Sequence, residues 1–176
     1  MGALPQLFMR NTHLDNLKPL VIPKGFTLHT HVQGNEDVWE KIIESAFGTK
    51  FSFQKTIVEG GGYKPEYVLY VSKDGVDIAT ATAVEKADFP GEGWFRMIGT
   101  SKEARGLGAG KLVCLAALYS LAQRGYKSTV LSTDDSRIPA ISMYLSLGFE
   151  PLYTHESHKE RWDNVMKEIN KNKIKI

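Results

Sequence analysis

The sequence has little cysteine, little net charge and no long apolar run. Its 176 residues contain one cysteine, Cys114, so they cannot form an internal disulfide or a cysteine-only metal site. A single thiol suits a reducing compartment. Met1 to Arg10 lacks the basic and apolar regions of a signal peptide, and no apolar run approaches the ~20 residues of a membrane span. We therefore expect a cytoplasmic protein that does not enter a membrane.

The net charge excludes a strong electrostatic field. With 22 basic and 20 acidic residues the formal net charge is +2, which does not favour non-specific nucleic-acid binding. The C-terminal end is locally basic, and we expect it to be solvated. Contact of this end with nucleic acid or with a membrane remains an alternative. The lysines of this end are Lys167, Lys171, Lys173 and Lys175.

A metal site has weak support. His29 and His31 are two positions apart, as a pair of zinc ligands on one side of a strand would be. No third or fourth ligand is evident from the sequence. We predict no metal site and a solvent-facing pair of histidines.

The hydrophobic pattern changes along the chain. The first half predicts a strand over 25–32, a helix over 35–47, a hairpin of 67–73 and 76–85 around Asp74-Gly75, and a strand over 94–100. The second half alternates, with helices over 108–124 and from Pro139 to 147, and strands over 128–133 and 149–154. This order predicts the α/β class (α+β mixed sheet), with a central, mixed, mostly antiparallel sheet flanked by helices.

The two ends of the chain fall outside this pattern. Residues 1–24 contain Pro5, Pro19 and Pro23 with little periodicity, which predicts a loosely ordered N-terminal arm. Residues 25–155 form the predicted domain, and 156–176 a charged C-terminal helix or tail, helical from His158 to Ile169.

A glycine-rich loop stands between a predicted strand and helix. It reads Arg105-Gly106-Leu107-Gly108-Ala109-Gly110-Lys111. Glycines allow a backbone to approach a phosphate closely, and the start of a helix presents unpaired N–H groups to an anion. A P-loop is excluded because Arg105 and Leu112 replace its first glycine and its Ser or Thr, and a dinucleotide fingerprint because Lys111 replaces its third glycine. A turn that only packs a helix against a strand remains an alternative.

This loop resembles the R/Q-x-x-G-x-G/A signature of the GCN5-related N-acetyltransferase (GNAT) superfamily. A second family feature follows at the expected distance, a small-residue and apolar segment from Ala140 that ends in Tyr144 and Gly148-Phe149. The two features together are far more specific than either one. The order of elements matches from about Gly25 to Thr154, which makes 25–155 the candidate GNAT acetyltransferase domain.

The resemblance implies an acyl-CoA N-acyltransferase fold and an acetyl-CoA (CoA) cosubstrate, with no metal. The acetyl group would go to a primary amine of a small molecule or a protein, by direct attack through a tetrahedral intermediate. Tyr144 would be the general acid that protonates the leaving thiolate. The strand before the loop would pair its backbone with pantetheine, and the loop would bind the pyrophosphate. These cofactor-binding positions are Ile98, Gly99, Thr100, Arg105, Gly106, Leu107, Gly108, Ala109, Gly110 and Lys111.

Several alternatives stay open. A non-catalytic acyl-CoA sensor would keep the loop while Tyr144 only packs, and another nucleotide binder could use the same loop. Arg137 stands where many family members have Asn, and either reaches CoA phosphates or is solvated. No general base is marked, and the nearest acidic candidates are Glu85, Asp88 and Glu92.

The acceptor pocket and the oligomeric state are the least determined features. A partly aromatic acceptor pocket is a hypothesis that rests on Phe51, Phe53, Tyr63, Phe89 and Trp94. Trp39 and Trp162 are predicted to bury apolar surface, which leaves a homodimer contact open.

Overall fold

The computed structural model describes residues 4–85 and 88–174 and contains a seven-stranded sheet in the order β2-β3-β4-β5-β6-β1-β7. Neighbouring strands are antiparallel except β5 and β6, which are parallel. The predicted mixed, mostly antiparallel sheet is confirmed. The strands are β1(Leu7–Asn11), β2(Phe26–Thr30), β3(Val68–Lys73), β4(Val76–Glu85), β5(Gly93–Thr100), β6(Thr129–Thr133) and β7(Glu150–Leu152).

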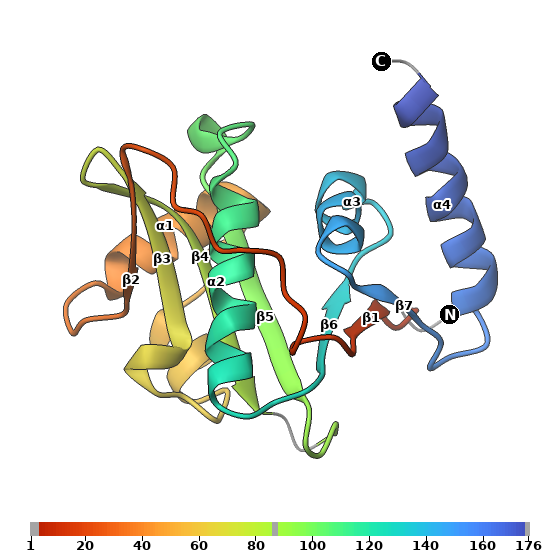
Figure 1. Ribbon diagram of the computed structural model, residues 1–176, viewed down its shortest axis with the longest axis horizontal. Coiled ribbons are helices and arrows are strands. Elements are labelled where there is room, and N and C mark those ends of the chain that lie inside the picture. Colours follow the sequence, from red (N-terminus) through yellow and green to blue (C-terminus); the bar gives the residue numbers. More distant parts are fainter. Residues whose placement is uncertain (1–3, 86–87, 175–176) are drawn as a thin grey trace.

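Helices cover both faces of the sheet (Figure 1). Helix α1(Glu36–Phe47) packs on one face of β4 and β5, and α2(Ala109–Gln123) packs on the other. Helix α2 is apolar around most of its circumference because the sheet covers one side and the N-terminal segment with Leu14, Leu17 and Leu20 covers another. Helices α3(Ile138–Ser146) and α4(His158–Ile174) lie beside the β6-β1-β7 half of the sheet.

The N-terminal segment is not a loosely ordered arm. Leu7–Asn11 is inserted between β6 and β7, with Leu7 opposite Thr133 and Asn11 opposite Thr129. Leu7 and Met9 are buried in the main core. The prediction for residues 1–24 is therefore wrong over this strand, because alternation over only five residues is a weak signal; residues 1–3 lie outside the described part of the chain.

The C-terminal helix also belongs to the fold. Helix α4 places Trp162, Val165 and Ile169 in the same buried cluster as Leu7 and Met9, so it packs along one face and is solvated only along the other. Trp39 is buried as well, in the cluster between α1 and the sheet. Both tryptophans thus bury apolar surface within the chain, as predicted.

Local turn chemistry explains the hairpin. Asp74 and Gly75 both have positive φ, 51° and 83°, which is the conformation of a two-residue turn between β3 and β4. The predicted hairpin is confirmed. Between α1 and β3 the chain forms a short helical turn, η1(Gln54–Val58).

The strand assignment of the N-terminal segment predicts a stability effect. Met9→Ala removes a fully buried side chain (0% exposed), so we expect the free energy of unfolding to fall by about 2–5 kcal/mol in urea denaturation. Val21→Ala, at a side chain that is 72% exposed, should change it by less than about 0.5 kcal/mol. Equal effects of the two substitutions would contradict the placement of β1 in the core.

Candidate functional site

The site begins where two strands of the sheet separate. Within the described residues, β5 and β6 pair at Gly93 with Thr129 and Trp94 with Val130, and at no later position. Figure 1 shows the two strands diverging beyond that point. This separation leaves the backbone of β5 from Phe95 to Thr100 without a strand partner on that side among the described residues.

A bulge lies in the separated part of β5. The β4–β5 ladder passes from Thr82 with Arg96 to Thr80 with Gly99, so Met97 and Ile98 together oppose one residue of β4. Met97 has a φ of 49°, an uncommon conformation for a residue other than glycine. Such strain persists only where the surrounding structure holds it, and it is frequent at functional sites.

A cavity of about 600 Å³, here called the loop cavity, lies between the glycine loop, β5 and α3. Most of the sequence-predicted cofactor-binding residues line it; Gly99 and Leu107 are not among the described lining residues. A Cβ on Gly99 would lie 2.9 Å from Ile43 Cδ1, so this glycine permits the close packing of α1. The predicted residues that do line the cavity are Ile98, Thr100, Arg105, Gly106, Gly108, Ala109, Gly110, Lys111 and Tyr144.

The start of α2 opens into the loop cavity. Its N-cap residue, Gly108, has a φ of 82°, and no side chain of residues 4–85 or 88–174 caps the helix. The first N–H groups of α2 therefore lack a capping partner beside the exposed side chains of Arg105 and Lys111. Gly110 allows the helix to approach β5, since a Cβ there would lie 2.8 Å from Thr100 Oγ1.

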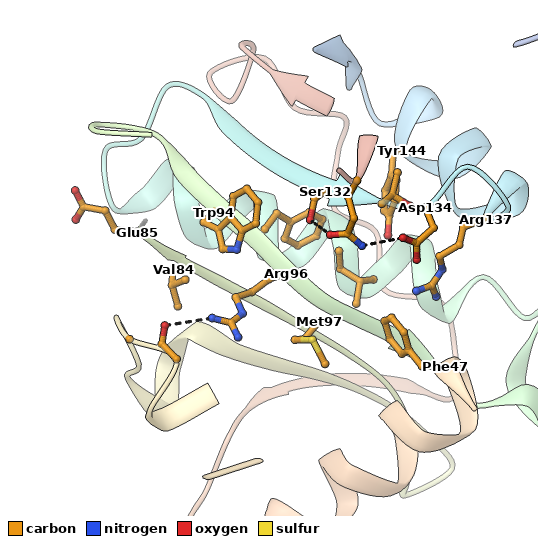
Figure 2. Close-up of a pocket in the computed structure, with 16 residues that line it drawn as sticks. Phe47, Val84, Glu85, Trp94, Arg96, Met97, Ser132, Asp134, Arg137 and Tyr144 are labelled. Atoms are coloured by element: carbon orange, nitrogen blue, oxygen red, sulfur yellow. Dashed lines mark hydrogen bonds between the residues drawn. The ribbon is translucent and has the colours of Figure 1, made fainter. Parts of the chain in front are cut away.

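A second cavity of about 360 Å³, here called the β5–β6 pocket, continues from the first along the separated strands (Figure 2). The two cavities share Ile98, Arg137 and Tyr144. Arg137 lies with its guanidinium carbon 4.0 Å from the centre of the Phe47 ring, between the two spaces. The pocket is lined by Gln6, Phe47, Gly60, Gly61, Val84, Glu85, Trp94, Phe95, Arg96, Met97, Ile98, Ser132, Thr133, Asp134, Arg137 and Tyr144.

Tyr144 is the hydroxyl-bearing side chain at this junction that the sequence predicted. It is 5% exposed, and its ring lies 5.9 Å from that of Phe149 in an edge-to-face arrangement. Burial raises the pKa of the phenol well above its ordinary value, so the hydroxyl keeps its proton throughout the neutral range. At physiological pH the group is therefore present as O–H and not as a phenolate.

Residues 36–149, which include the loop, the splayed strands and Tyr144, match the acetyltransferase (GNAT) family. The chain belongs to this family. The fold predicted from the resemblance is thereby confirmed, and the glycine loop, Arg137 and Tyr144 of this GNAT chain all lie within the matched residues.

Similar proteins agree with the assignment. A mycothiol acetyltransferase from Arthrobacter sp. (strain FB24) is 38% identical over 154 residues, which cover 80% of this chain and 48% of that protein. A GCN5-related N-acetyltransferase from Sphaerobacter thermophilus superposes with a TM-score of 0.65 at 25% identity, over 85% of this chain and 50% of that one. Naa50 from Arabidopsis thaliana, solved with the bisubstrate analogue CoA-Ac-MVNAL, superposes with a TM-score of 0.60 at 14% identity, over 76% of this chain and 89% of that one.

The match covers only part of each similar protein. The GNAT chain spans about half the length of three mycothiol acetyltransferases that it matches, between 45% and 50% of each. Among residues 4–85 and 88–174, none of its helices is long and apolar enough to cross a membrane.

The acidic residues of the pocket differ from those expected. Of the three candidates from the sequence, Glu85 is among the described residues that line the β5–β6 pocket, whereas Asp88 and Glu92 are not. Glu92 pairs with Arg10 at 2.9 Å. Asp134 lines the pocket and was missed, although its position directly after β6, at the carboxyl end of a parallel strand, is a usual place for functional residues.

The aromatic pocket was predicted wrongly for most of its members. Of the five residues proposed, Trp94 is the one among the described lining residues. Phe53 instead packs in the core between α1 and the sheet, with Trp39 as its neighbour, and Phe89 stacks on Trp94 with ring centres 5.8 Å apart. Phe47, from α1, lines the pocket in their place.

The prediction of a solvent-facing pair of histidines is wrong for His31, which is buried, whereas the side chain of His29 is 35% exposed. His31 is 4% exposed, and its ring centre lies 4.5 Å from that of Phe53. Its Nδ1 shares a hydrogen bond of 3.1 Å with the Tyr70 hydroxyl. Burial lowers the pKa of His31. His29 is bound to Asp77 at 2.7 Å, and in the described part of the chain no three potential metal ligands lie together.

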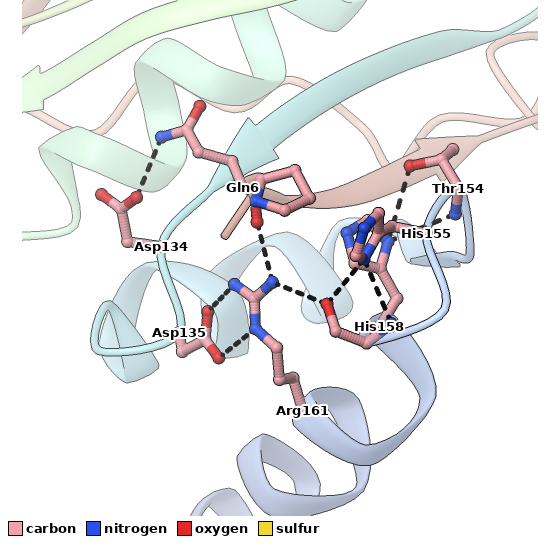
Figure 3. Close-up of polar contacts among 9 residues, drawn as sticks. Gln6, Asp134, Asp135, Thr154, His155, His158 and Arg161 are labelled. Atoms are coloured by element: carbon pink, nitrogen blue, oxygen red, sulfur yellow. Dashed lines mark hydrogen bonds and ion pairs between the residues drawn. The ribbon is translucent and has the colours of Figure 1, made fainter. Parts of the chain in front are cut away.

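A polar network joins α4 and β1 to the wall of the β5–β6 pocket (Figure 3). Gln6 donates to Asp134 Oδ1 at 3.0 Å and accepts from the Ser132 hydroxyl at 2.7 Å. Arg161 of α4 donates to both carboxylate oxygens of Asp135, with Nε 2.8 Å from Oδ2, and to the Pro5 carbonyl at 2.7 Å. The network thus fixes the segment that carries Asp134 and Arg137.

This network predicts a pH-dependent stability. The Arg161 guanidinium, by hydrogen bonding, lowers the pKa of Asp135, so the pair stabilises the fold above the unfolded-state pKa near 4 and is lost as the pH falls through the lower folded-state value. We expect Asp135→Asn to lower the free energy of unfolding by about 1 kcal/mol at neutral pH, because partial exposure screens the pair.

The measurement is chemical denaturation of wild type and variant across pH. Their difference should shrink as the pH falls below the unfolded-state pKa near 4 and through the lower folded-state pKa of Asp135. Asp163→Asn, on the exposed face of α4, is the matched control and should show no such dependence. A difference that stays constant with pH would contradict the role assigned to the ion pair.

Proposed function

We propose that this GNAT chain is an N-acetyltransferase that binds acetyl-CoA in the loop cavity and acetylates a primary amine entering through the β5–β6 pocket. One observation carries the proposal, namely that the two cavities share Ile98, Arg137 and Tyr144. A thioester reaching this junction from one side and an amine reaching it from the other would meet beside a protonated phenol.

The chemistry of the loop cavity fits acetyl-CoA. The uncapped start of α2, with Arg105 and Lys111 beside it, offers N–H donors and positive charge to a pyrophosphate. The unpaired edge of β5 from Ile98 to Thr100 offers peptide groups to the amides of pantetheine. The family assignment and the CoA-containing ligand of the Naa50 structure support the same cosubstrate.

The residues at the junction would carry the reaction. The amine attacks the thioester carbonyl, and we assign the backbone N–H of Ile98, at the β5 bulge, to the developing oxyanion. Tyr144 donates its proton to the departing thiolate. Asp134 and Glu85 would favour the positively charged form of an incoming amine, which gives up one proton to water before attack. The second proton, lost from the nitrogen as the thiolate departs and the amide forms, returns to the Tyr144 phenolate.

The acceptor is a small molecule or a peptide amine. The name of the mycothiol acetyltransferases favours a small molecule, and the peptide-like ligand of Naa50 favours a peptide. The competing function is a non-catalytic acyl-CoA sensor, which would bind acetyl-CoA and turn over no amine.

The assignment of the loop predicts the effect of a charge at Gly108. In calorimetry, wild type should bind acetyl-CoA at micromolar strength, about −8 kcal/mol. Gly108→Glu should weaken binding by about 100-fold or more, because the carboxylate would repel the pyrophosphate at the start of α2. Gly125→Glu is the matched control, since Gly125 also has a positive φ and open space at its Cβ but lies beyond the other end of α2. Loss of binding in both variants, or in neither, would reject the loop assignment.

The general-acid assignment predicts a selective loss of turnover. Tyr144→Phe keeps the buried ring and removes the proton donor, so kcat with the best amine of a panel should fall by about 10²- to 10⁴-fold, while the Kd for acetyl-CoA stays within a few-fold. Tyr119→Phe, at a hydroxyl that binds the Lys18 carbonyl outside both cavities, should leave kcat nearly unchanged. An unchanged kcat in Tyr144→Phe would exclude Tyr144 as the acid, and binding without turnover in wild type would favour the sensor.

A further inference from the structure

Arg96 presents a cation to the β5–β6 pocket without a carboxylate partner. Its side chain reaches across to the segment before β3, where Nη2 donates to the Thr56 carbonyl at 2.5 Å and Nη1 to the Gly60 carbonyl at 3.5 Å. In the described part of the chain no carboxylate forms an ion pair with it, whereas Arg10 and Arg161 are paired with Glu92 and Asp135. Burial lowers the pKa of Arg96, because removal from water disfavours the charged form of the guanidinium.

Arg96 keeps N–H donors that the two carbonyl contacts do not use. A guanidinium has five N–H donors, of which the two carbonyls take two. None of the buried side-chain nitrogens that lack a partner in the described structure belongs to Arg96. The Nε donor, which has no partner among the described residues, is therefore accessible, and Nη1 and Nη2 each keep one further N–H. Figure 2 shows the guanidinium among the pocket residues beside Trp94.

The opposite charge lies elsewhere in the pocket. Asp134 stands on the far wall beside Tyr144, and Glu85 lies at the other end (Figure 2). Arg96 precedes Ile98 by two residues on β5, so their Cα atoms are at most about 7 Å apart. A molecule of modest size could thus place an amine near Ile98 and Tyr144 and an anionic group on Arg96.

We infer that the acceptor amine carries a carboxylate, and that Arg96 binds this carboxylate and thereby selects the substrate. A planar guanidinium with free donors matches the two oxygens of a carboxylate, because two parallel hydrogen bonds can form. The two carbonyl contacts fix the guanidinium plane before the substrate arrives. This inference deepens the proposed function and rests on it.

The experiment compares matched pairs of acceptors. Amino acids from glycine to δ-aminovalerate are tested against their primary amides, and glycyl-aspartate against glycyl-asparagine, at equal concentrations of unprotonated amine. We measure acetyl-CoA-dependent kcat/KM, and calorimetric binding of each probe with and without CoA. Wild type should favour the carboxylated member of at least one pair by about 10- to 100-fold. A preference for the free amino acids would indicate a small-molecule acceptor, and a preference for glycyl-aspartate would indicate a peptide acceptor.

Variants of Arg96 distinguish its binding of a substrate carboxylate from its structural support of the Thr56–Gly60 segment. Arg96→Gln should reduce the preference to less than about threefold, mainly through KM, and Arg96→Lys should retain part of it. Arg124→Gln is the matched control, because Arg124 also binds a backbone carbonyl, that of Ala83 at 2.6 Å, but is not among the described lining residues. It should keep the full wild-type preference.

The results that would overturn the inference are distinct. A wild type that acetylates or binds no carboxylated probe better than its amide would exclude it, and so would an Arg96→Gln variant that weakens both members of each pair equally, as a purely structural residue would. Absence of acetyl-CoA binding by wild type would instead reject the proposed function, while the probe-binding arm without CoA still tests Arg96.

Discussion

The parallel contact between β5 and β6 is the constraint on which the site depends. It consists of two residue pairs, reinforced by the Gly93 N–H to the Ser128 carbonyl at 2.9 Å and the Thr129 hydroxyl to the Gly93 carbonyl at 2.9 Å. A side chain at Gly93 would collide with Leu121, whose Cδ2 lies 2.5 Å from the position of a Cβ. The strands are thus held together at one end and are free to separate at the other, where both cavities lie.

The β6 side of the opening needs its own support. The half-sheet β6-β1-β7 meets the rest of the sheet only at the short parallel contact, so its position depends on packing and on polar links within the described residues. His158 of α4 stacks on Phe8 of β1, and Arg161 ties α4 to Asp135. These elements, which the family resemblance does not cover, hold the wall that carries Asp134 and Tyr144.

The sequence predicts those features that rest on local chemistry. The Asp74-Gly75 hairpin, the helix after the glycine loop and the fold class all follow from turn residues, periodicity and a specific motif. It does not predict β1, whose partners lie in β6 and β7, or Gln6 and Asp134, which meet only when that strand is in place. His31 was misjudged for a related reason, since its burial comes from Phe53 and Tyr70 on other elements rather than from its own strand.

The position of β1 between β6 and β7 has a consequence for the order in which the chain assembles. Gln6 and Asp134 are 128 positions apart, so the first strand has no partner until β6 has been synthesised. Contacts of such sequence separation close late and slow folding. During synthesis the segment with the apolar residues Leu7, Phe8 and Met9 would stay unpaired until β6 has left the ribosome. In that interval its apolar side chains would be accessible to a chaperone.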